Sequence, residues 1–160
     1  MSSLQIDGAE KINEGSYYVE ISMGREKVTS AIAYLTVIQN ISFSGALDQP
    51  NWSFKTSQTP STWFGQTKWS SDSMDAAQSG SIGDGEISSF STLVEGPATI
   101  QFHWKVSSEE NYDWLQCWVD DDLQRSISGD VDWSEEQVLV PLGLHNVRWV
   151  YTKDASEAEG

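Results

Sequence analysis

Three side chains suited to sugar binding occupy every second position of one predicted strand. They are Trp114, Gln116 and Trp118, and residues spaced by two lie on the same face of a β-strand. A tryptophan ring can stack on the apolar face of a pyranose, while an amide can hydrogen-bond to the sugar hydroxyl groups. This spacing predicts an aromatic platform for a carbohydrate.

Three basic side chains are predicted to complete the platform. His103 and Lys105 lie on the polar face of the preceding strand, which is the expected neighbour in the sheet, and Arg148 comes from the last predicted strand. Their N–H groups can donate hydrogen bonds to ligand oxygens. Another interpretation fits the same residues, because this face could be covered by the loop from Asn51 to Trp69 or by the N-terminal strands.

Acidic side chains gather in three places and indicate a calcium site. The groups are residues 120–122, the pair Asp130 and Asp132, and the pair Asp75 and Asp84 in a loop with several backbone carbonyl groups. Calcium is bound by about six to eight oxygen atoms that converge on it. None of the three groups matches an EF-hand loop, and a solvated acidic face is the alternative.

Motifs for catalysis are missing from the sequence. No Gly-x-Ser-x-Gly nucleophile motif, glycine-rich phosphate loop or dinucleotide fingerprint occurs. Glycoside hydrolysis needs a pair of carboxylates, one of them with a raised pKa, and none of the acidic residues lies in an alternating Glu-x-Asp strand. We therefore predict a non-catalytic protein.

The composition excludes several classes of partner. The chain has 160 residues, a net charge of −15, eight Trp and five Tyr. An acidic surface repels nucleic acid phosphates and anionic lipids, whose binding needs basic patches. No apolar run is long enough to cross a bilayer, and the first residues lack the basic and apolar segments of a secretory signal. Cys117 is the only cysteine, so an intrachain disulfide is excluded.

Short strands with period-two alternation, and the lack of long helical patterns, predict an all-β fold. The clearest pair of strands places one apolar face toward a core, and the members of that face are Phe102, Trp104, Leu115, Cys117 and Val119. Between Trp52 and Trp69, aromatic residues are scattered through polar segments. Such residues either close the end of a sandwich or stack on a ligand.

The first part of the chain carries a short pattern of predicted strands and turns. Glu14, Gly15 and Tyr17 form an acidic-Gly-x-Tyr pattern, a hairpin with a turn at Gly24 follows, and three short strands are expected. This pattern resembles the last strands of an immunoglobulin-like sandwich. The resemblance implies a partial domain that carries only those strands. The predicted boundaries are 1–39 for this segment and 40–46 for a linker.

The remainder, residues 47–160, contains four blocks of sequence that resemble one family. The blocks are DAAQSGSIGDGEISSF, GPATIQFHWKVSSEENYDWLQCWVDD, SISGDVDW and HNVRWVYTKDAS. They are similar to a jelly-roll β-sandwich module of large secreted bacterial proteins, related in outline to MAM and concanavalin A-like sandwiches. The resemblance implies an extracellular or cell-surface location, Asp75 and Asp84 as the preferred calcium ligands, and a sandwich that lacks its final strand and so has an unpaired edge.

These observations lead to one functional hypothesis and two alternatives. We expect a non-catalytic extracellular module for adhesion or carbohydrate binding, which meets a glycan or protein ligand at a surface. Neighbouring domains of a longer chain are expected, and nucleic acid and direct membrane insertion are not. The first alternative is a structural spacer with all its tryptophans buried. The second is a glycoside hydrolase with a lectin-like fold.

Overall fold

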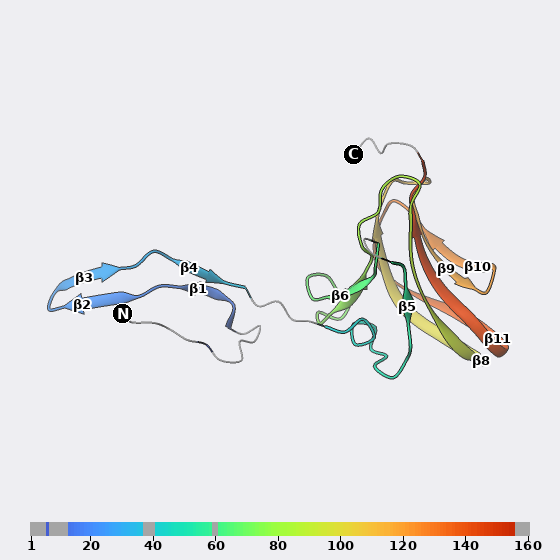
Figure 1. The fold of residues 1–160 in the computed structure, drawn as a ribbon, viewed down its shortest axis with the longest axis horizontal. Coiled ribbons are helices and arrows are strands. Elements are labelled where there is room, and N and C mark those ends of the chain that lie inside the picture. The colour runs from blue at the N-terminus through green and yellow to red at the C-terminus, as the bar shows by residue number, and fades with distance from the viewer. Residues whose placement is uncertain (1–5, 7–12, 37–40, 59–60, 156–160) are drawn as a thin grey trace. The chain divides into compact units, whose positions relative to one another are not determined.

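The computed structural model describes residue 6 and residues 13–36, 41–58 and 61–155. The chain divides into two compact units, Met1–Asn40 and Ile41–Gly160. The regular structure of the described residues consists of antiparallel strands without an α-helix, which confirms the predicted all-β class (Figure 1). Within these ranges, no helix has the length and apolar character needed to cross a membrane.

The described residues of the first unit form an antiparallel hairpin built from four short strands, one more than predicted. Strand β1 (Gly15–Tyr17) pairs with β4 (Ala33–Leu35), and β2 (Glu20–Met23) pairs with β3 (Glu26–Thr29). The turn contains Gly24 with φ 65°, a left-handed conformation that glycine adopts without a Cβ clash. The expected turn residue is therefore confirmed.

The hydroxyl group of Tyr17 donates a hydrogen bond of 2.6 Å to the carbonyl oxygen of Asn13. Immunoglobulin-like sandwiches contain a tyrosine at the start of a late strand whose hydroxyl bonds to the backbone a few residues upstream. This local bond matches that arrangement. The immunoglobulin-like origin of the segment stays a prediction, because one bond does not define a domain.

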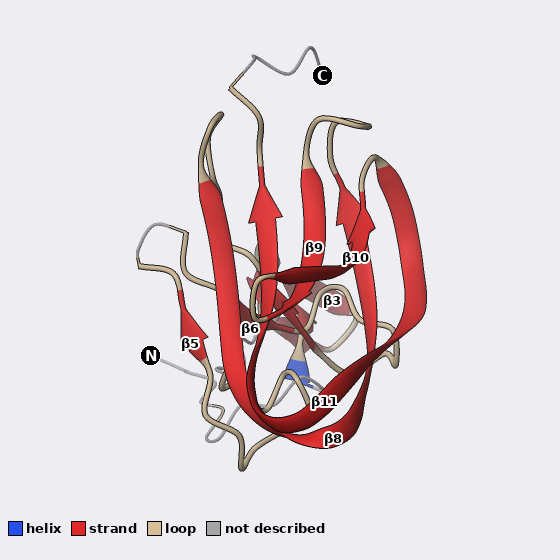
Figure 2. Cartoon of the chain, turned by 90° about the vertical axis from the view of Figure 1, so that its right-hand side faces the viewer, coloured by secondary structure: helices blue, strands red, loops and turns tan. Residues whose placement is uncertain are grey.

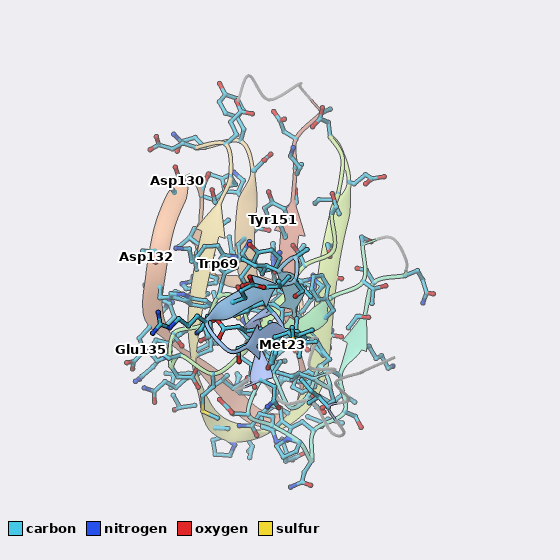
Figure 3. All side chains as sticks on the ribbon, turned by 90° about the vertical axis from the view of Figure 1, so that its left-hand side faces the viewer. Met23, Trp69, Asp130, Asp132, Glu135 and Tyr151 are labelled. Carbon is cyan, nitrogen blue, oxygen red and sulfur yellow. The ribbon has the colours of Figure 1, made fainter. Side chains whose placement is uncertain are left out.

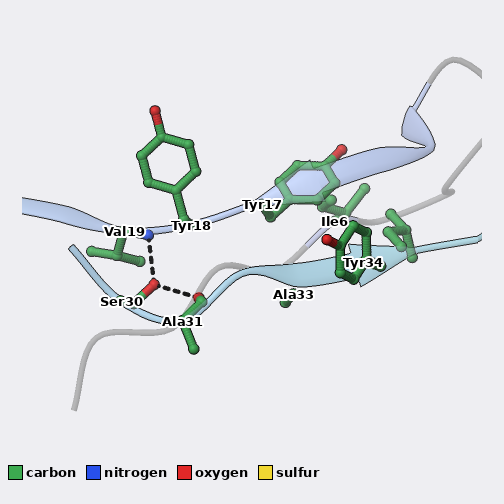
Figure 4. Close-up of a pocket in the computed structure, with 9 residues that line it drawn as sticks. Ile6, Tyr17, Tyr18, Val19, Ser30, Ala31, Ala33 and Tyr34 are labelled. Carbon is green, nitrogen blue, oxygen red and sulfur yellow. Dashed lines mark hydrogen bonds between the residues drawn. The ribbon is translucent and has the colours of Figure 1, made fainter.

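The hairpin leaves most of its apolar side chains exposed. Figure 4 shows a shallow pocket of about 370 Å³ on it, where Ser30 accepts a hydrogen bond from the backbone N–H of Val19 and donates one to Ala31. The exposed apolar side chains of the hairpin are Tyr18, Val19, Ile21, Met23, Val28, Ile32 and Tyr34. A two-stranded hairpin has no second layer of its own in which to bury them.

The second unit contains a five-stranded antiparallel sheet and a separate two-stranded one. The order in the larger sheet is β10-β9-β11-β8-β5, and β6 pairs with β7 in the smaller one. The strands are β5 (Lys55–Thr56), β6 (Phe64–Gln66), β7 (Ala76–Gln78), β8 (Ile87–Ser107), β9 (Trp114–Val119), β10 (Asp122–Ile127) and β11 (Asp130–Thr152).

Strands β8 and β11 pair along their whole length and form a long ribbon that bends over (Figure 2). Their register shifts between Val140 and Gly143, opposite Gly96. We call residues 87–95 of β8 with 144–152 of β11 the first arm, and residues 98–107 of β8 with 130–140 of β11 the second arm. Within this ribbon, strands β9 and β5 pair with the first arm and not with the second. The second arm folds back as the other layer of a sandwich.

The core lies between the two arms. On the first arm, Phe90 stacks on Trp149 with ring centroids 4.8 Å apart and an interplanar angle of 9°. From the second arm, Phe102 meets the same tryptophan edge-on at 5.3 Å. The predicted inner face is confirmed, with Phe102 partly buried and Trp104, Leu115, Cys117 and Val119 buried.

Cys117 is fully buried, and burial raises the pKa of its thiol to about 12. A thiol with so high a pKa is protonated at neutral pH and is a poor nucleophile. Its position on the inner face of β9 identifies it as a small packing residue of the core.

Residues 41–46 pack on the sandwich instead of acting as a linker. The ring of Phe43 lies edge-on to Phe54 and Phe90, at 5.6 Å and 5.2 Å, and Ala46 is buried. The segment forms no strand, and its backbone groups make turn hydrogen bonds such as that from the Ala46 N–H to the Ser42 carbonyl oxygen. Glycine and polar residues suggested a flexible junction, but burial of the aromatic ring fixes the segment.

An ion pair between Asp120 and His145 joins the β9–β10 turn to β11. The Asp120 carboxylate lies 2.7 Å from His145 Nδ1 and accepts a hydrogen bond of 2.9 Å from the Asn146 backbone N–H. The hydrogen bond to His145 is the main cause that lowers the Asp120 pKa, and the same bond raises the His145 pKa.

This pair makes stability depend on pH. The Asp120 contribution is present above its unfolded pKa, about 3.9, and is lost as pH falls through the lower folded value. The His145 contribution is present below its unfolded pKa, about 6.5, and is lost as pH rises through the higher folded value. We expect the melting temperatures of the wild type and Asp120→Asn to differ most between about pH 4 and 6.5. Asp121→Asn is the control, and a constant difference from pH 5 to 9 would contradict the prediction.

Candidate functional site

Four of the six residues predicted for the carbohydrate platform lie together on the outer face of the first layer. Trp114, Gln116 and Trp118 share one face of β9, and Arg148 of β11 lies directly opposite Trp118 in the register. The guanidinium carbon of Arg148 is 5.8 Å from the Trp118 ring centroid. Trp118 Nε1 also donates a hydrogen bond of 3.2 Å to Gln116 Oε1.

These contacts occupy the groups that a sugar would use. The Arg148 side chain lies over the Trp118 ring, and the Gln116 amide oxygen already accepts a hydrogen bond. Both tryptophans are partly buried, and Arg148 Nε is buried without a hydrogen-bond partner among the described residues. The outer face of β9 is thus partly closed by its own side chains.

His103 and Lys105 lie on the second arm and do not join this group. Strand β11 stands between β8 and β9 in the sheet, so the two strands that follow each other in sequence are not neighbours. Lys105 Nζ pairs with Asp132 at 2.7 Å, and His103 Nε2 lies 3.8 Å from Glu135. Figure 3 shows Asp132 and Glu135 spaced along β11. The prediction that β8 and β9 are neighbours was wrong, because β11, which comes later in the sequence, lies between them in the sheet.

Asp75 and Asp84, the predicted calcium ligands, have different surroundings. The Asp84 carboxylate accepts a hydrogen bond of 3.3 Å from Lys153 Nζ, whereas Asp75 interacts electrostatically with Asp48 and Asp72. In the described part of the chain, no three His, Cys, Asp or Glu side chains form a group able to hold a metal ion. A calcium site stays a prediction.

A groove of about 650 Å³ lies in the second unit, and we call it the β7–β8 groove. One wall is the unbroken run 99–107 of β8, and the other contains the unbroken run 75–79, which includes β7. Side chains on one strand point alternately to opposite faces. Because consecutive residues line the groove on both walls, the edges of the strands face it.

Neither strand edge at the groove is paired. Residues 98–107 of β8 pair with β11 on one side, and β5 reaches only Phe90 and Ser91 of the first arm. Strand β7 pairs with β6 alone. Within the described residues, no strand pairs with the second side of either element. An unpaired edge presents a row of backbone donors and acceptors.

Aromatic rings form the floor and the rim of the groove. Core rings of Phe90, Phe102 and Trp149 line its floor, while Trp69 is 56% exposed and Trp52 is 37% exposed. The aromatic segment from 52 to 69 thus contains rings that pack on the core, such as Trp63 and Phe54, and rings that stand exposed. Stacking of the exposed rings on a ligand stays a prediction.

The turn that carries Trp69 is stabilised by the side chain of Gln66. The side chain of Gln66 donates a hydrogen bond of 2.5 Å to the Trp69 carbonyl oxygen and accepts bonds from the backbone N–H groups of Lys68 and Trp69 at 2.6 Å and 2.9 Å. Lys68 Nζ lies 5.1 Å from the Trp69 ring centroid. The backbone that carries the exposed ring is thus fixed, which lowers the entropy cost of ordering this turn on a ligand.

Three carboxylates give the lining of the groove a negative charge. Asp48, Asp72 and Asp75 line it. Burial is the main cause that raises the Asp75 pKa, and repulsion by Asp48 and Asp72 raises it further. The backbone N–H of Met74 lowers the Asp72 pKa. A cation placed here would relieve the repulsion between these carboxylates.

Two indole groups at the groove have unused hydrogen-bonding capacity. Trp63 and Trp104 line the groove, and their Nε1 atoms are buried without a partner among the described residues. Trp104 is only 4% exposed. A buried donor without a partner costs about 1–3 kcal/mol.

Comparisons with known proteins bear on the fold alone. No family model and no curated protein matches the chain. Among solved structures it is similar to a secreted serine protease, VesC, from Vibrio cholerae, at 17% sequence identity and a TM-score of 0.50. The similarity covers 82% of this chain and 27% of the protease chain. At this identity it supports a shared arrangement of strands and not a shared activity.

The groove could not be located from the sequence. Its walls are separated by some twenty residues in the chain, and nothing in the alternation of β8 shows where the ribbon bends or which edge stays free. The available signal was the set of tryptophans in polar segments, of which Trp52 and Trp69 reach the groove rim. Of the predicted site residues, the groove gathers Asp75, His103 and Lys105.

Proposed function

We propose that this chain is a non-catalytic adhesion module of a secreted or surface-anchored bacterial protein and that it binds its ligand in the β7–β8 groove. The observation that carries the proposal is the groove itself, about 650 Å³ in volume and lined by aromatic and acidic side chains. Ligand sites in proteins are concave, largely apolar and furnished with a few polar groups. The β9 face, where we first placed the ligand, is partly closed by Arg148.

The extracellular location is part of the same proposal. The protease that shares the arrangement of strands is described as secreted, and the sequence blocks resemble modules of secreted bacterial proteins. An acidic chain with a single buried cysteine needs no disulfide chemistry to fold outside the cell.

The test compares the wild type with two tryptophan variants on one array of glycans and synthetic peptides. We expect the wild type to bind a subset of these ligands, Trp69→Ala to lose about ten-fold in affinity and Trp118→Ala to stay within about two-fold. Trp69 is at the groove and Trp118 is on the β9 face, so the pair separates the two sites. Absence of any wild-type binding, or a larger loss in Trp118→Ala, would overturn the proposal.

The spacer alternative assumed that all tryptophans are buried. That assumption does not hold, because Trp69 and Trp52 are exposed. Collisional quenching of tryptophan fluorescence by iodide measures this exposure directly. We expect a quenchable fraction in the wild type that falls in Trp69→Ala.

One observation favours the hydrolase alternative. Asp72 and Asp75 both line the groove, and their pKa values are shifted in opposite directions, as is common for the acid and the nucleophile of glycosidases. However, Asp75, the carboxyl whose pKa is raised, is only partly buried, whereas the apolar surroundings that raise a catalytic carboxyl pKa exclude water. Release of reducing sugar from a panel of polysaccharides, abolished in Asp75→Asn, would replace the adhesion proposal by a catalytic one.

A further inference from the structure

We propose that the β7–β8 groove binds an extended strand of a partner protein, which adds to the free edge of β8, directs apolar side chains to the core and places a lysine or arginine near Asp75. This inference rests on the proposed function and names the class of its ligand. Strand addition to a sheet edge supplies backbone hydrogen bonds for affinity and side-chain pockets for specificity.

The backbone at both walls is the first argument. Among the described residues, the run 99–107 of β8 and strand β7 are each paired on one side only. A strand of nine residues spans about 27–30 Å, so one extended segment can follow the whole run. Every second residue of β8 directs its N–H and C=O groups away from β11, and an added strand presents a matching row of donors and acceptors to them.

The floor of the groove is the second argument. Phe90, Leu115 and Trp149 belong to the core and also line the groove, so the groove borders the apolar core. Alternate side chains of an added strand would point toward these residues.

The negative charge of the groove is the third argument, and it favours a partner strand with a basic side chain. Asp48, Asp72 and Asp75 line the groove, while Lys105 on the facing strand is already paired with Asp132. The whole chain has a net charge of −15. A basic side chain on the incoming strand therefore gains attraction both at the groove and at long range.

The probes are three nine-residue synthetic peptides. The first has lysine at both ends with valine and threonine alternating between them, the second has glutamate in place of lysine, and the third has proline at two of the threonine positions. We expect only the lysine peptide to bind well, because proline removes backbone donors and glutamate meets the aspartates. When the lysine peptide is bound, the backbone amide hydrogen of every second residue in 99–107 should exchange with deuterium at least about ten-fold more slowly.

A charge reversal provides the matched control. We expect Asp75→Lys to weaken the lysine peptide about five-fold and to improve binding of the glutamate peptide. Asp121→Lys changes the net charge equally at an exposed turn outside the groove and should stay within about two-fold. Far-ultraviolet circular dichroism confirms that both variants fold.

The outcomes separate this inference from the function on which it rests. Lysine-peptide binding without protection of the 99–107 amides, or equal binding of the proline peptide, overturns strand addition. Glycan binding that is lost in Trp69→Ala, with no peptide bound, also overturns strand addition but leaves the adhesion module standing. No ligand of either class on the array overturns both.

Discussion

Trp149→Ala is expected to lower the free energy of unfolding of the second unit by about 3–5 kcal/mol. Trp149 contacts both arms of the bent ribbon, since it stacks on Phe90 at 4.8 Å and meets Phe102 edge-on at 5.3 Å. Removing the ring leaves a cavity at the place where the two layers are joined, and the bend keeps the arms from collapsing into it. A domain of this size is stable by about 5–15 kcal/mol, so the variant loses a large share of its stability.

Urea denaturation followed by far-ultraviolet circular dichroism measures the change without relying on the deleted fluorophore. Leu139→Ala is the matched control, because Leu139 is on the same strand but 73% exposed. We expect the control to stay within about 0.5 kcal/mol of the wild type. A loss below about 1 kcal/mol for Trp149→Ala would show that the two arms are not joined through this ring.

Alternation along a strand was enough to predict which residues face the core. Phe102, Trp104, Leu115, Cys117 and Val119 all lie on the inner side as expected, because side-chain direction depends only on local backbone geometry. The all-β class followed from the same local signal together with the lack of helical periodicity.

Which strands are neighbours in the sheet could not be predicted from alternation. The predicted carbohydrate platform depended on this, because its residues come from different strands. His103 and Trp118 were placed on adjacent strands because their strands follow each other in sequence, but β11 pairs between them. Pairing in a sheet is decided by long-range packing, which carries no signature in a window of a few residues. Trp118 and Arg148 were brought together as predicted, since both belong to strands that do pair.

The continuity of β8 was the second feature that could not be predicted from the sequence. Glu95, Gly96 and Pro97 have the composition of a turn, yet β8 continues through them as one strand of 21 residues. Glycine and proline usually punctuate regular structure, but at this position they bend a paired ribbon without ending it. The groove exists because the ribbon bends here, so a prediction that ends the strand also loses the site.

Gly96→Ala is expected to destabilise the second unit by about 3 kcal/mol because of that bend. A Cβ atom at Gly96 would lie 1.6 Å from the Pro141 carbonyl oxygen and 2.8 Å from that of Val140. Both neighbours are backbone atoms of the partner strand, so no side-chain rotation can remove the clash. The two strands would have to separate at the bend, and the faces of the two arms, with Phe102 and Trp149, would separate with them.

Gly83→Ala is the matched control for the general effect of replacing glycine. A Cβ atom there would meet only the flexible Glu86 side chain, at 3.7 Å and 3.9 Å. Replacing glycine where the backbone allows it reduces the entropy of the unfolded chain and stabilises by about 0.4–1 kcal/mol. We therefore expect the two substitutions to shift the urea midpoint in opposite directions. If Gly96→Ala matched Gly83→Ala, the close approach of β8 and β11 at the bend, and with it the folded-back second arm that forms the groove wall, would be refuted.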